Sequence, residues 1–121
     1  MKTTLQLPDN LKVSLNQYYA GMHWTKRKKL KDDYLIWFSQ YKNKFQKFTS
    51  QVEIQFDFHF RKQPLDCDNC VAIAKMVTDC MIKADIIQDD SYKHIVKVAY
   101  TSKKTKDENY IDVEIKESIG E

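Results

Sequence analysis

The feature that most constrains the fold of this sequence is a strict alternation of apolar and polar residues between Val52 and Arg61. The apolar positions of this run are Val52, Ile54, Phe56, Phe58 and Phe60. Successive side chains of a β-strand point to opposite faces, so a period of two predicts a strand with one buried face. Pro64 closes the strand, because proline cannot donate a hydrogen bond to a neighbouring strand. The sequence therefore predicts a sheet with one apolar face, which other elements must cover.

Two segments have the apolar spacing of amphipathic helices and are expected to cover that face. The first extends from Thr25 to Phe48, and the side opposite its apolar stripe is rich in lysine. The second extends from Asn69 to Ala84, and either Asp68 or Asn69 is suited to cap its first turn. The stripes comprise Leu30, Tyr34, Trp37, Phe38, Tyr41, Phe45 and Phe48 in the first helix and Ile73, Met76, Val77, Cys80, Met81 and Ala84 in the second.

Three weaker strand patterns complete the expected fold, at residues 2–7, 92–101 and 110–116. The charged turn SKKTKDEN joins the last two, and residues 8–24 are expected to be irregular. The resulting order is β-α-β-α-β-β. It predicts an α+β fold, a two-layer sandwich in which two helices cover one face of a mixed sheet. The other face of the sheet is then free for a partner.

Length and composition limit the class of protein. A chain of 121 residues is expected to form one domain, residues 1–121, and 42% hydrophobic residues is typical of a globular chain. No apolar run reaches the ~18 residues that a membrane-spanning helix needs, so no membrane association is expected. The first residues lack the apolar core of a signal peptide, which favours a cytoplasmic protein. The odd number of cysteines, three, argues against a disulfide framework.

The net charge of +3 conceals an asymmetry along the chain. Residues 1–50 carry a balance of +7, with ten basic and three acidic residues, whereas residues 51–121 carry −4, with ten basic and fourteen acidic residues. This distribution suits a protein that binds a polyanion with one surface and a metal ion with another. The alternative is a lysine-rich helix that is simply solvated.

Acidic residues gather in two short stretches, PLDCDNC at residues 64–70 and QDDS at residues 88–91. At 100° per residue, Asp68, Lys75 and Asp79 fall on one narrow stripe of the second helix, away from its apolar side. Asp66 lies on the loop after the strong strand. Asp89 and Asp90 lie where the helix leads into the next strand, and they are expected to return to the same edge of the sheet.

Carboxylates that converge in this way repel one another unless a cation lies among them. Oxygen ligands select Mg²⁺ or Mn²⁺, and such a metal can activate a water and stabilise charge on a phosphate. A lysine on the same stripe can stabilise that charge as well. The alternative is that Asp68 is a helix cap, Lys75 and Asp79 an ion pair, and Asp89 and Asp90 a turn.

The run LDCDN, followed by Lys75, Asp79 and the segment DDS, resembles the RusA-type Holliday junction resolvases, endodeoxyribonucleases common in phages and prophages. In that family a D-x-D-N element precedes a helix with a lysine and a further aspartate, and an acidic pair opens the next strand. The segment SLNQYY, at residues 14–19, is similar to an early motif of the family. The resemblance extends from Ser14 to about Lys104. Lys75 and Asp79 stand about one helical turn later here than in the best-known members.

The resemblance implies roles for individual residues. It implies a homodimer that makes paired nicks in a four-way DNA junction during recombination, repair or phage DNA processing. The implied Mg²⁺ ligands are Asp66, Asp68 and Asp90, with Mn²⁺ as a substitute for Mg²⁺, and Lys75 is the implied catalytic lysine. Asn69, Asp79 and Asp89 take supporting roles. The residues expected to contact DNA are Asn16, Tyr18, Tyr19, Lys26, Arg27, Lys28, Lys29, Lys31, Lys103 and Lys104.

Two other functions stay open from the residues alone. In a non-catalytic nucleic-acid-binding module, the basic segment would bind phosphates, the aromatics Tyr18, Tyr19 and Trp24 would stack on unpaired bases, and the acids would be structural. In a zinc-stabilised interaction domain, Cys67 and Cys70 would be ligands, because C-x-x-C is a zinc-site spacing. A structural zinc needs four ligands, so Cys80 and a histidine would have to join them.

Overall fold

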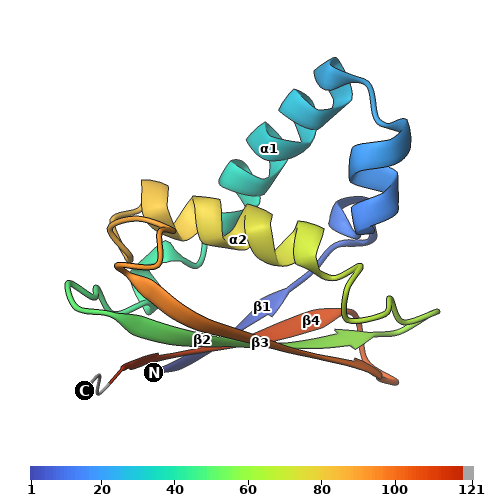
Figure 1. The fold of residues 1–121 in the computed structure, drawn as a ribbon. Coiled ribbons are helices and arrows are strands. Elements are labelled where there is room, and N and C mark those ends of the chain that lie inside the picture. The colour runs from blue at the N-terminus through green and yellow to red at the C-terminus, as the bar shows by residue number, and fades with distance from the viewer. Residues whose placement is uncertain (119–121) are drawn as a thin grey trace.

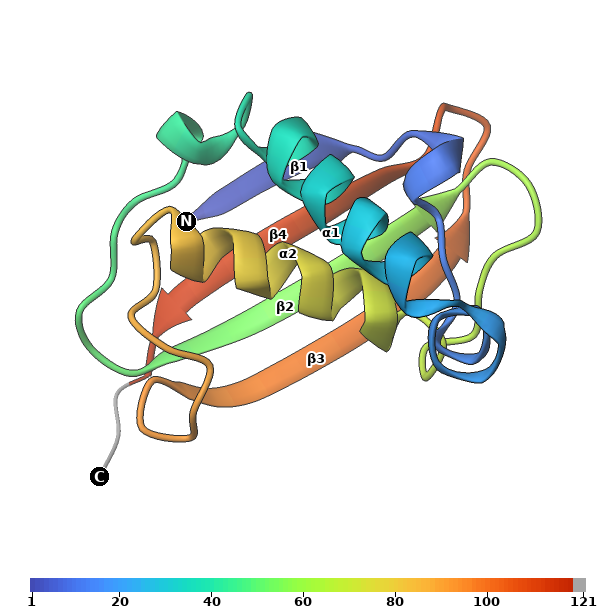
Figure 2. The same ribbon diagram turned by 90° about the horizontal axis from the view of Figure 1, so that it is seen from above.

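The computed structural model describes residues 1–118 and confirms the α+β class, with two main helices stacked on one face of a mixed four-stranded sheet (Figures 1 and 2). The elements are β1 (Lys2–Gln6), α1 (Trp24–Phe38), β2 (Val52–Phe60), α2 (Val71–Lys83), β3 (Ile95–Lys104) and β4 (Tyr110–Glu117). Short helical turns at Asp9–Leu11, Gln17–Gly21 and Lys42–Lys44 interrupt the connections. Among the described residues, no helix combines the length and the apolar character needed to cross a membrane.

The strand order of the sheet is β1-β4-β2-β3, and the sheet is mixed. β2 pairs with β3 in parallel and with β4 antiparallel, and β1 pairs antiparallel with β4. β2 is hydrogen-bonded to a strand on each side, so its residues differ in exposure mainly according to which face of the sheet they occupy. This explains the regular alternation of apolar and polar residues in its sequence. Since β2 and β3 are parallel, the loop that leaves β2 and the loop that enters β3 lie at opposite edges of the sheet.

The core lies between the sheet and the two helices. The rings of Phe56, Phe58 and Phe60 stack along β2, and Tyr100 of β3 stacks on Phe56 with 5.9 Å between centroids. α2 lies over the centre of the sheet and α1 crosses beside it towards β1 (Figure 2). The hydroxyl of the buried Tyr34 in α1 donates to the carbonyl of Leu11 at 2.6 Å, so this polar group is satisfied inside the core.

The first helix is shorter than its apolar spacing predicts. α1 ends at Phe38, although Tyr41, Phe45 and Phe48 are buried as the stripe predicts. Residues 42–44 form a single tight turn, and the N–H of Phe48 then donates to the carbonyl of Ile86 at 2.8 Å. The apolar spacing thus identifies which side chains are buried, but the backbone beyond Phe38 follows the turn towards β2.

Two further expectations about element ends are wrong. Cys70 precedes α2 and no side chain caps the helix, while the amide oxygen of Asn69 accepts a hydrogen bond from the N–H of Asn16 at 3.4 Å. β3 begins at Ile95 rather than Tyr92. The carbonyl of Ser91 accepts hydrogen bonds from the N–H groups of residues 94 and 95, and this turn delays the start of the strand.

The sheet face opposite the helices carries a network of polar side chains. The carboxylate of Asp57 accepts hydrogen bonds from the Thr101 hydroxyl at 2.6 Å and from the Gln55 amide at 2.9 Å. Burial alone would raise the pKa of the Asp57 carboxyl, but these two hydrogen bonds act in the opposite direction and hold the pKa below its usual value. Beside it, the ring of His59 stacks on Tyr110 at 4.2 Å.

A lowered pKa at Asp57 predicts a pH-dependent contribution to stability. The ionised carboxylate stabilises the fold above the unfolded pKa of about 3.9, and this contribution is lost as the pH falls through the lower folded pKa. We expect Asp57→Asn to be destabilised at pH 7 and to approach the wild type in acid. Denaturant unfolding at neutral pH and below pH 4 measures the difference. Asp107→Asn, in the exposed turn before β4, is the matched control; a pH-independent difference for Asp57→Asn would contradict the prediction.

Candidate active site

A solvent-open groove of about 230 Å³ runs between α2 and β3, and three of the predicted site residues line it. β3 is an edge strand, so its helix-facing residues Val98 and Tyr100 are only partly covered by α2. Lys75 and Asp79 reach the groove from α2, and Asp90 reaches it from the loop before β3. The predicted stripe of α2 is therefore directed away from the core, as expected for residues with a chemical role.

A hydrogen bond from the backbone of Asp90 to the side chain of the neighbouring Asp89 fixes the turn in which they lie. The N–H of Asp90 donates to Oδ1 of Asp89 at 2.7 Å, and this bond holds the pKa of the Asp89 carboxyl below its usual range. The carboxylate of Asp89 is therefore hydrogen-bonded within the turn, whereas Asp90 borders the groove with Lys75 and Asp79. The supporting role of Asp89 stays a prediction.

Asp66 and Asp68 lie on an exposed turn at the other end of the groove. The carbonyl of Asp66 accepts hydrogen bonds from the N–H groups of Asn69 and Cys70 at 2.9 and 3.1 Å, which closes the turn ahead of α2. The thiol of Cys67 contacts the carbonyl of Tyr100 at 3.8 Å, and Tyr100 lines the groove. Cys67 therefore lies beside the groove, and Asp66 and Asp68, on the same turn, are exposed to solvent.

The two acidic stretches do not return to the same edge of the sheet, and that expectation is corrected by the parallel pairing of β2 with β3. The stripe of Asp68, Lys75 and Asp79 was inferred from angles around the helix axis, which give no distances along that axis. At 1.5 Å per residue, the part of α2 from Val71 to Asp79 alone separates the acidic turn from Asp79 by about 12 Å along the helix axis. Within residues 1–118, no three side chains of histidine, cysteine, aspartate or glutamate are grouped closely enough to hold a metal ion.

The donor set nevertheless has the chemistry that Mg²⁺ requires. Mg²⁺ retains several waters and commonly binds through one or two carboxylates together with substrate phosphates. Asp66 and Asp68 stand on one turn, and Asp79 and Asp90 both line the groove, so each pair offers carboxylate oxygens of the kind that Mg²⁺ binds. Lys75 precedes Asp79 by about one helical turn in α2, about 6 Å along the helix axis.

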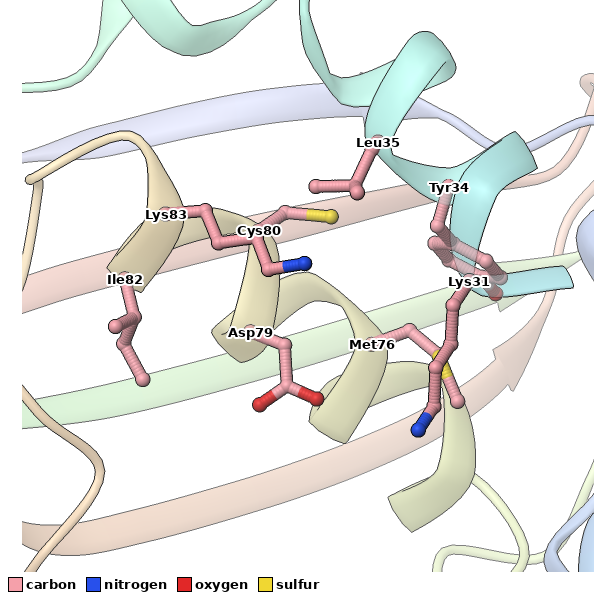
Figure 3. A pocket seen from close by; sticks show the side chains of 8 residues that line it. All are labelled: Lys31, Tyr34, Leu35, Met76, Asp79, Cys80, Ile82 and Lys83. Atoms are coloured by element: carbon pink, nitrogen blue, oxygen red, sulfur yellow. The ribbon is translucent and has the colours of Figure 1, made fainter. Parts of the chain in front are cut away.

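The three thiols lie in different surroundings. Cys67 is exposed, Cys70 is buried beneath the turn, and Cys80 is buried in α2. Cys80 borders a second cleft, between α1 and α2, together with Tyr34 and with Asp79, which also borders the groove (Figure 3). Burial raises the pKa of Cys70 to about 11 and that of Cys80 to about 12. The thiols of the C-x-x-C segment thus differ in exposure, and Cys80 is separated from them by most of α2.

These environments predict the thiol reactivity of the native protein. We expect a thiol reagent at pH 8 to modify Cys67 rapidly and to reach Cys70 and Cys80 only after unfolding, because buried thiols with raised pKa values react slowly. Counting modified thiols in native and denatured protein measures this. Cys67→Ser should remove the rapid phase; a rapid phase that persists in this variant would contradict the assignment.

The basic residues expected to contact DNA occupy the first turns of α1. Lys28 and Lys29 form exposed ion pairs with the aspartates one turn later, Asp32 and Asp33, at 3.3 and 2.9 Å. The guanidinium of Arg27 donates to the carbonyl of Met22 at 3.1 Å. The remaining members are Lys26 and Lys31, both exposed in α1, and Lys103 and Lys104, exposed at the end of β3 nearer the Asp66–Asp68 turn.

The aromatic and amide residues of the early motif divide into structural and exposed groups. Tyr18 is buried, so its ring is not available to DNA, whereas Tyr19 is exposed. Asn16 and Leu15 bond to Asn69 through their N–H groups, which joins the early motif to the acidic turn. This link supports Asn69 as a positioning residue, a role that sequence spacing alone did not specify.

His23 has a role that the sequence did not reveal. Its Nδ1 accepts a hydrogen bond from the N–H of Thr25 at 3.2 Å and caps α1. An aspartate, asparagine, serine or threonine is the usual signal for such a cap, and histidine is not. The neighbouring Trp24, the first residue of α1, is exposed at the protein surface.

Comparison with models of known protein families finds no match for this sequence, and comparison with curated proteins finds no relative either. The similarity to the RusA-type resolvases therefore rests on the motif residues of the acidic turn, α2 and the loop before β3.

Proposed function

We propose that this protein is a Mg²⁺-dependent, structure-selective DNA endonuclease that resolves four-way junctions by paired phosphodiester hydrolysis. The observation that carries the proposal is the groove between α2 and β3, where Lys75, Asp79 and Asp90 meet at an open surface. The Asp66–Asp68 turn borders one end of this groove, and the basic start of α1 lies across α2 from it. Carboxylates, a lysine and flanking cations are the groups that metal-assisted phosphodiester hydrolysis uses.

In this proposal the chain supplies positions and charges. Because Asp90 lies at the other end of the sheet from Asp66 and Asp68, a Mg²⁺ ion would be held by the Asp66–Asp68 pair or by Asp90, in either case together with a substrate phosphate. Such an ion would lower the pKa of a water and offset charge on the phosphate. Lys75 donates to a phosphate oxygen and stabilises the charge that grows as the bond breaks. The lysines of α1 neutralise neighbouring phosphates and orient the DNA arms, without reading sequence.

Paired cuts need two active sites. The proposal therefore includes a homodimer with one site in each chain, acting on branched DNA in the cytoplasm. A monomer that cuts a junction once, with no second cut at the symmetric position, would contradict this part of the proposal while leaving the hydrolytic chemistry intact.

The decisive experiment uses a labelled four-way DNA junction beside a linear duplex, with Mg²⁺, with Mn²⁺ or with EDTA. We expect symmetric nicks in the junction that require the metal and are absent from Asp68→Asn, while junction binding by this variant is retained. Asp107→Asn removes a carboxylate from the exposed turn before β4, which does not line the groove, and should cut normally. Binding without cleavage in either metal would favour the non-catalytic binding module, and one tightly held zinc per purified chain would favour the interaction domain.

A further inference from the structure

A bay of about 440 Å³ opens beside the groove, on the side of α2 nearer α1. Its walls come from the turn at Gln17–Gly21, the first turns of α1 and the middle of α2. Lys75 and Asp79 line both the bay and the groove, so the two hollows share a wall. A group bound in the bay would therefore lie directly beside the candidate catalytic lysine.

The bay presents two aromatic side chains to solvent. Trp24 is 65% exposed and Tyr19 is 55% exposed, whereas Trp37, the other tryptophan, is 7% exposed. Large aromatic side chains at a surface are typical of binding sites, because their rings can stack on planar ligands. Exposed rings in the wall of a bay are more informative than an isolated exposed residue such as Tyr92.

Contacts within the protein hold both rings in place. The ring of Tyr19 packs edge-on against buried Tyr18 at 5.0 Å, and the guanidinium of Arg27 covers Tyr18 at 5.8 Å. The ring of Trp24 lies 5.7 Å from that of His23, which is itself bonded to Thr25. Rings that are already positioned lose little conformational freedom when a ligand binds.

The charges around the bay fit a nucleotide. Lys28 and Lys31 of α1 and Lys75 of α2 supply three ammonium groups, although Lys28 also pairs with Asp32. These cations suit the phosphates of a single strand. The carboxylate of Asp79 in the same bay is a hydrogen-bond acceptor for the exocyclic amino group of a base.

We propose that this aromatic bay binds an unpaired DNA base, stacked on Trp24 and Tyr19, with the adjoining phosphate held by Lys31 and Lys75. Stacking on aromatic rings between cations is the recurring mode of single-strand recognition, and it tolerates every base. A paired base cannot enter such a bay without leaving the duplex. This inference rests on the proposed endonuclease function. In such an enzyme the bay would select branched DNA by binding a base that is unpaired at the branch and placing its phosphate beside the groove.

The fluorescence of Trp24 tests the proposal without any cleavage. With EDTA present, we expect oligothymidylate to quench the exposed tryptophan and a duplex of the same length to quench it far less. Trp24→Leu should weaken oligothymidylate binding, followed by the anisotropy of a labelled oligonucleotide, by about 5- to 150-fold, because base stacking is worth about 1–3 kcal/mol. Trp24→Phe should restore most of the affinity, and Tyr92→Leu, at an exposed aromatic residue outside the bay, should leave it unchanged.

The outcomes separate this inference from the proposed function. Equal affinity of Trp24→Leu and wild type for single strands would overturn the proposal that the bay binds a base, even if Mg²⁺-dependent junction cleavage is observed. If single-strand binding depends on Trp24 but the protein never cuts DNA, base binding by the bay is supported and the proposed endonuclease activity is overturned. Anionic phospholipid vesicles provide the last comparison, since a blue shift with vesicles and no quenching by oligothymidylate would assign Trp24 to a membrane surface instead. Tyr19→Leu, which leaves the start of α1 intact, repeats the test if Trp24→Leu folds poorly.

Discussion

Replacing Phe58 with alanine is expected to destabilise the protein by about 3–5 kcal/mol. Phe58 is fully buried in the central strand, and its ring stacks between those of Phe56 and Phe60 at 6.1 and 6.0 Å. Its backbone lies opposite Ser102 of β3 and Ile111 of β4, so the sheet cannot shift to fill the cavity. Because domains are stable by only about 5–15 kcal/mol in total, much of the population would unfold on mild heating.

Denaturant unfolding followed by circular dichroism measures this loss. Tyr92→Ala removes an exposed aromatic ring from the turn before β3 and should change stability by no more than about 0.5 kcal/mol. A cost for Phe58→Ala as small as that of Tyr92→Ala would mean that the Phe56–Phe58–Phe60 stack does not hold the sheet to the helices.

Replacing Lys75 with alanine is expected to lower the rate of junction cleavage by about 10²–10³-fold, the usual cost of removing one group that stabilises transition-state charge. The stability of the fold should hardly change, because Lys75 is exposed on α2. Junction affinity should fall only slightly, since one phosphate contact among many is lost. Single-turnover cleavage with saturating enzyme separates the chemical step from binding.

Lys83→Ala is the matched control, because Lys83 is also an exposed lysine of α2 but does not line the groove. It should cut at nearly the wild-type rate. Equal losses in the two variants would show that α2 contributes only general positive charge, and a loss confined to junction affinity would remove Lys75 from the chemical step.

Much of the fold could be predicted from side-chain period, but strand neighbours could not. The alternation over β2 and the stripe of α2 report burial directly, and the structure confirms both elements to within two residues. That β1 pairs with β4 is not encoded in either pattern, because any half-buried strand presents the same alternation. The length of α1 was overestimated for a related reason, as Phe45 and Phe48 are buried without being helical.

The sequence predicted which side of α2 the candidate site residues occupy, but not how the two acidic stretches are placed relative to each other. The angular argument correctly placed Lys75 and Asp79 on the uncovered side of α2, and both line the groove. It could not place Asp66 relative to Asp90, because that depends on whether β2 and β3 run in the same direction. The metal ligands therefore stay a prediction. The exposure of Trp24 was also beyond sequence spacing, since an aromatic residue at the start of a helix can be buried or exposed.

The pairing of β1 with β4 has a consequence for how the chain folds. The first strand has no partner until the last one exists, because β4 alone separates β1 from the rest of the sheet. During synthesis β1 therefore waits, unpaired, while α1, β2, α2 and β3 emerge. Its early contacts include the Trp37 Nε1–H that bonds the carbonyl of Gln6 and the Tyr41 hydroxyl that accepts from the N–H of Gln6. Closing so long a loop slows folding, and a ribosome that stalls before β4 would leave the open side of β2 free to pair with a strand from another chain.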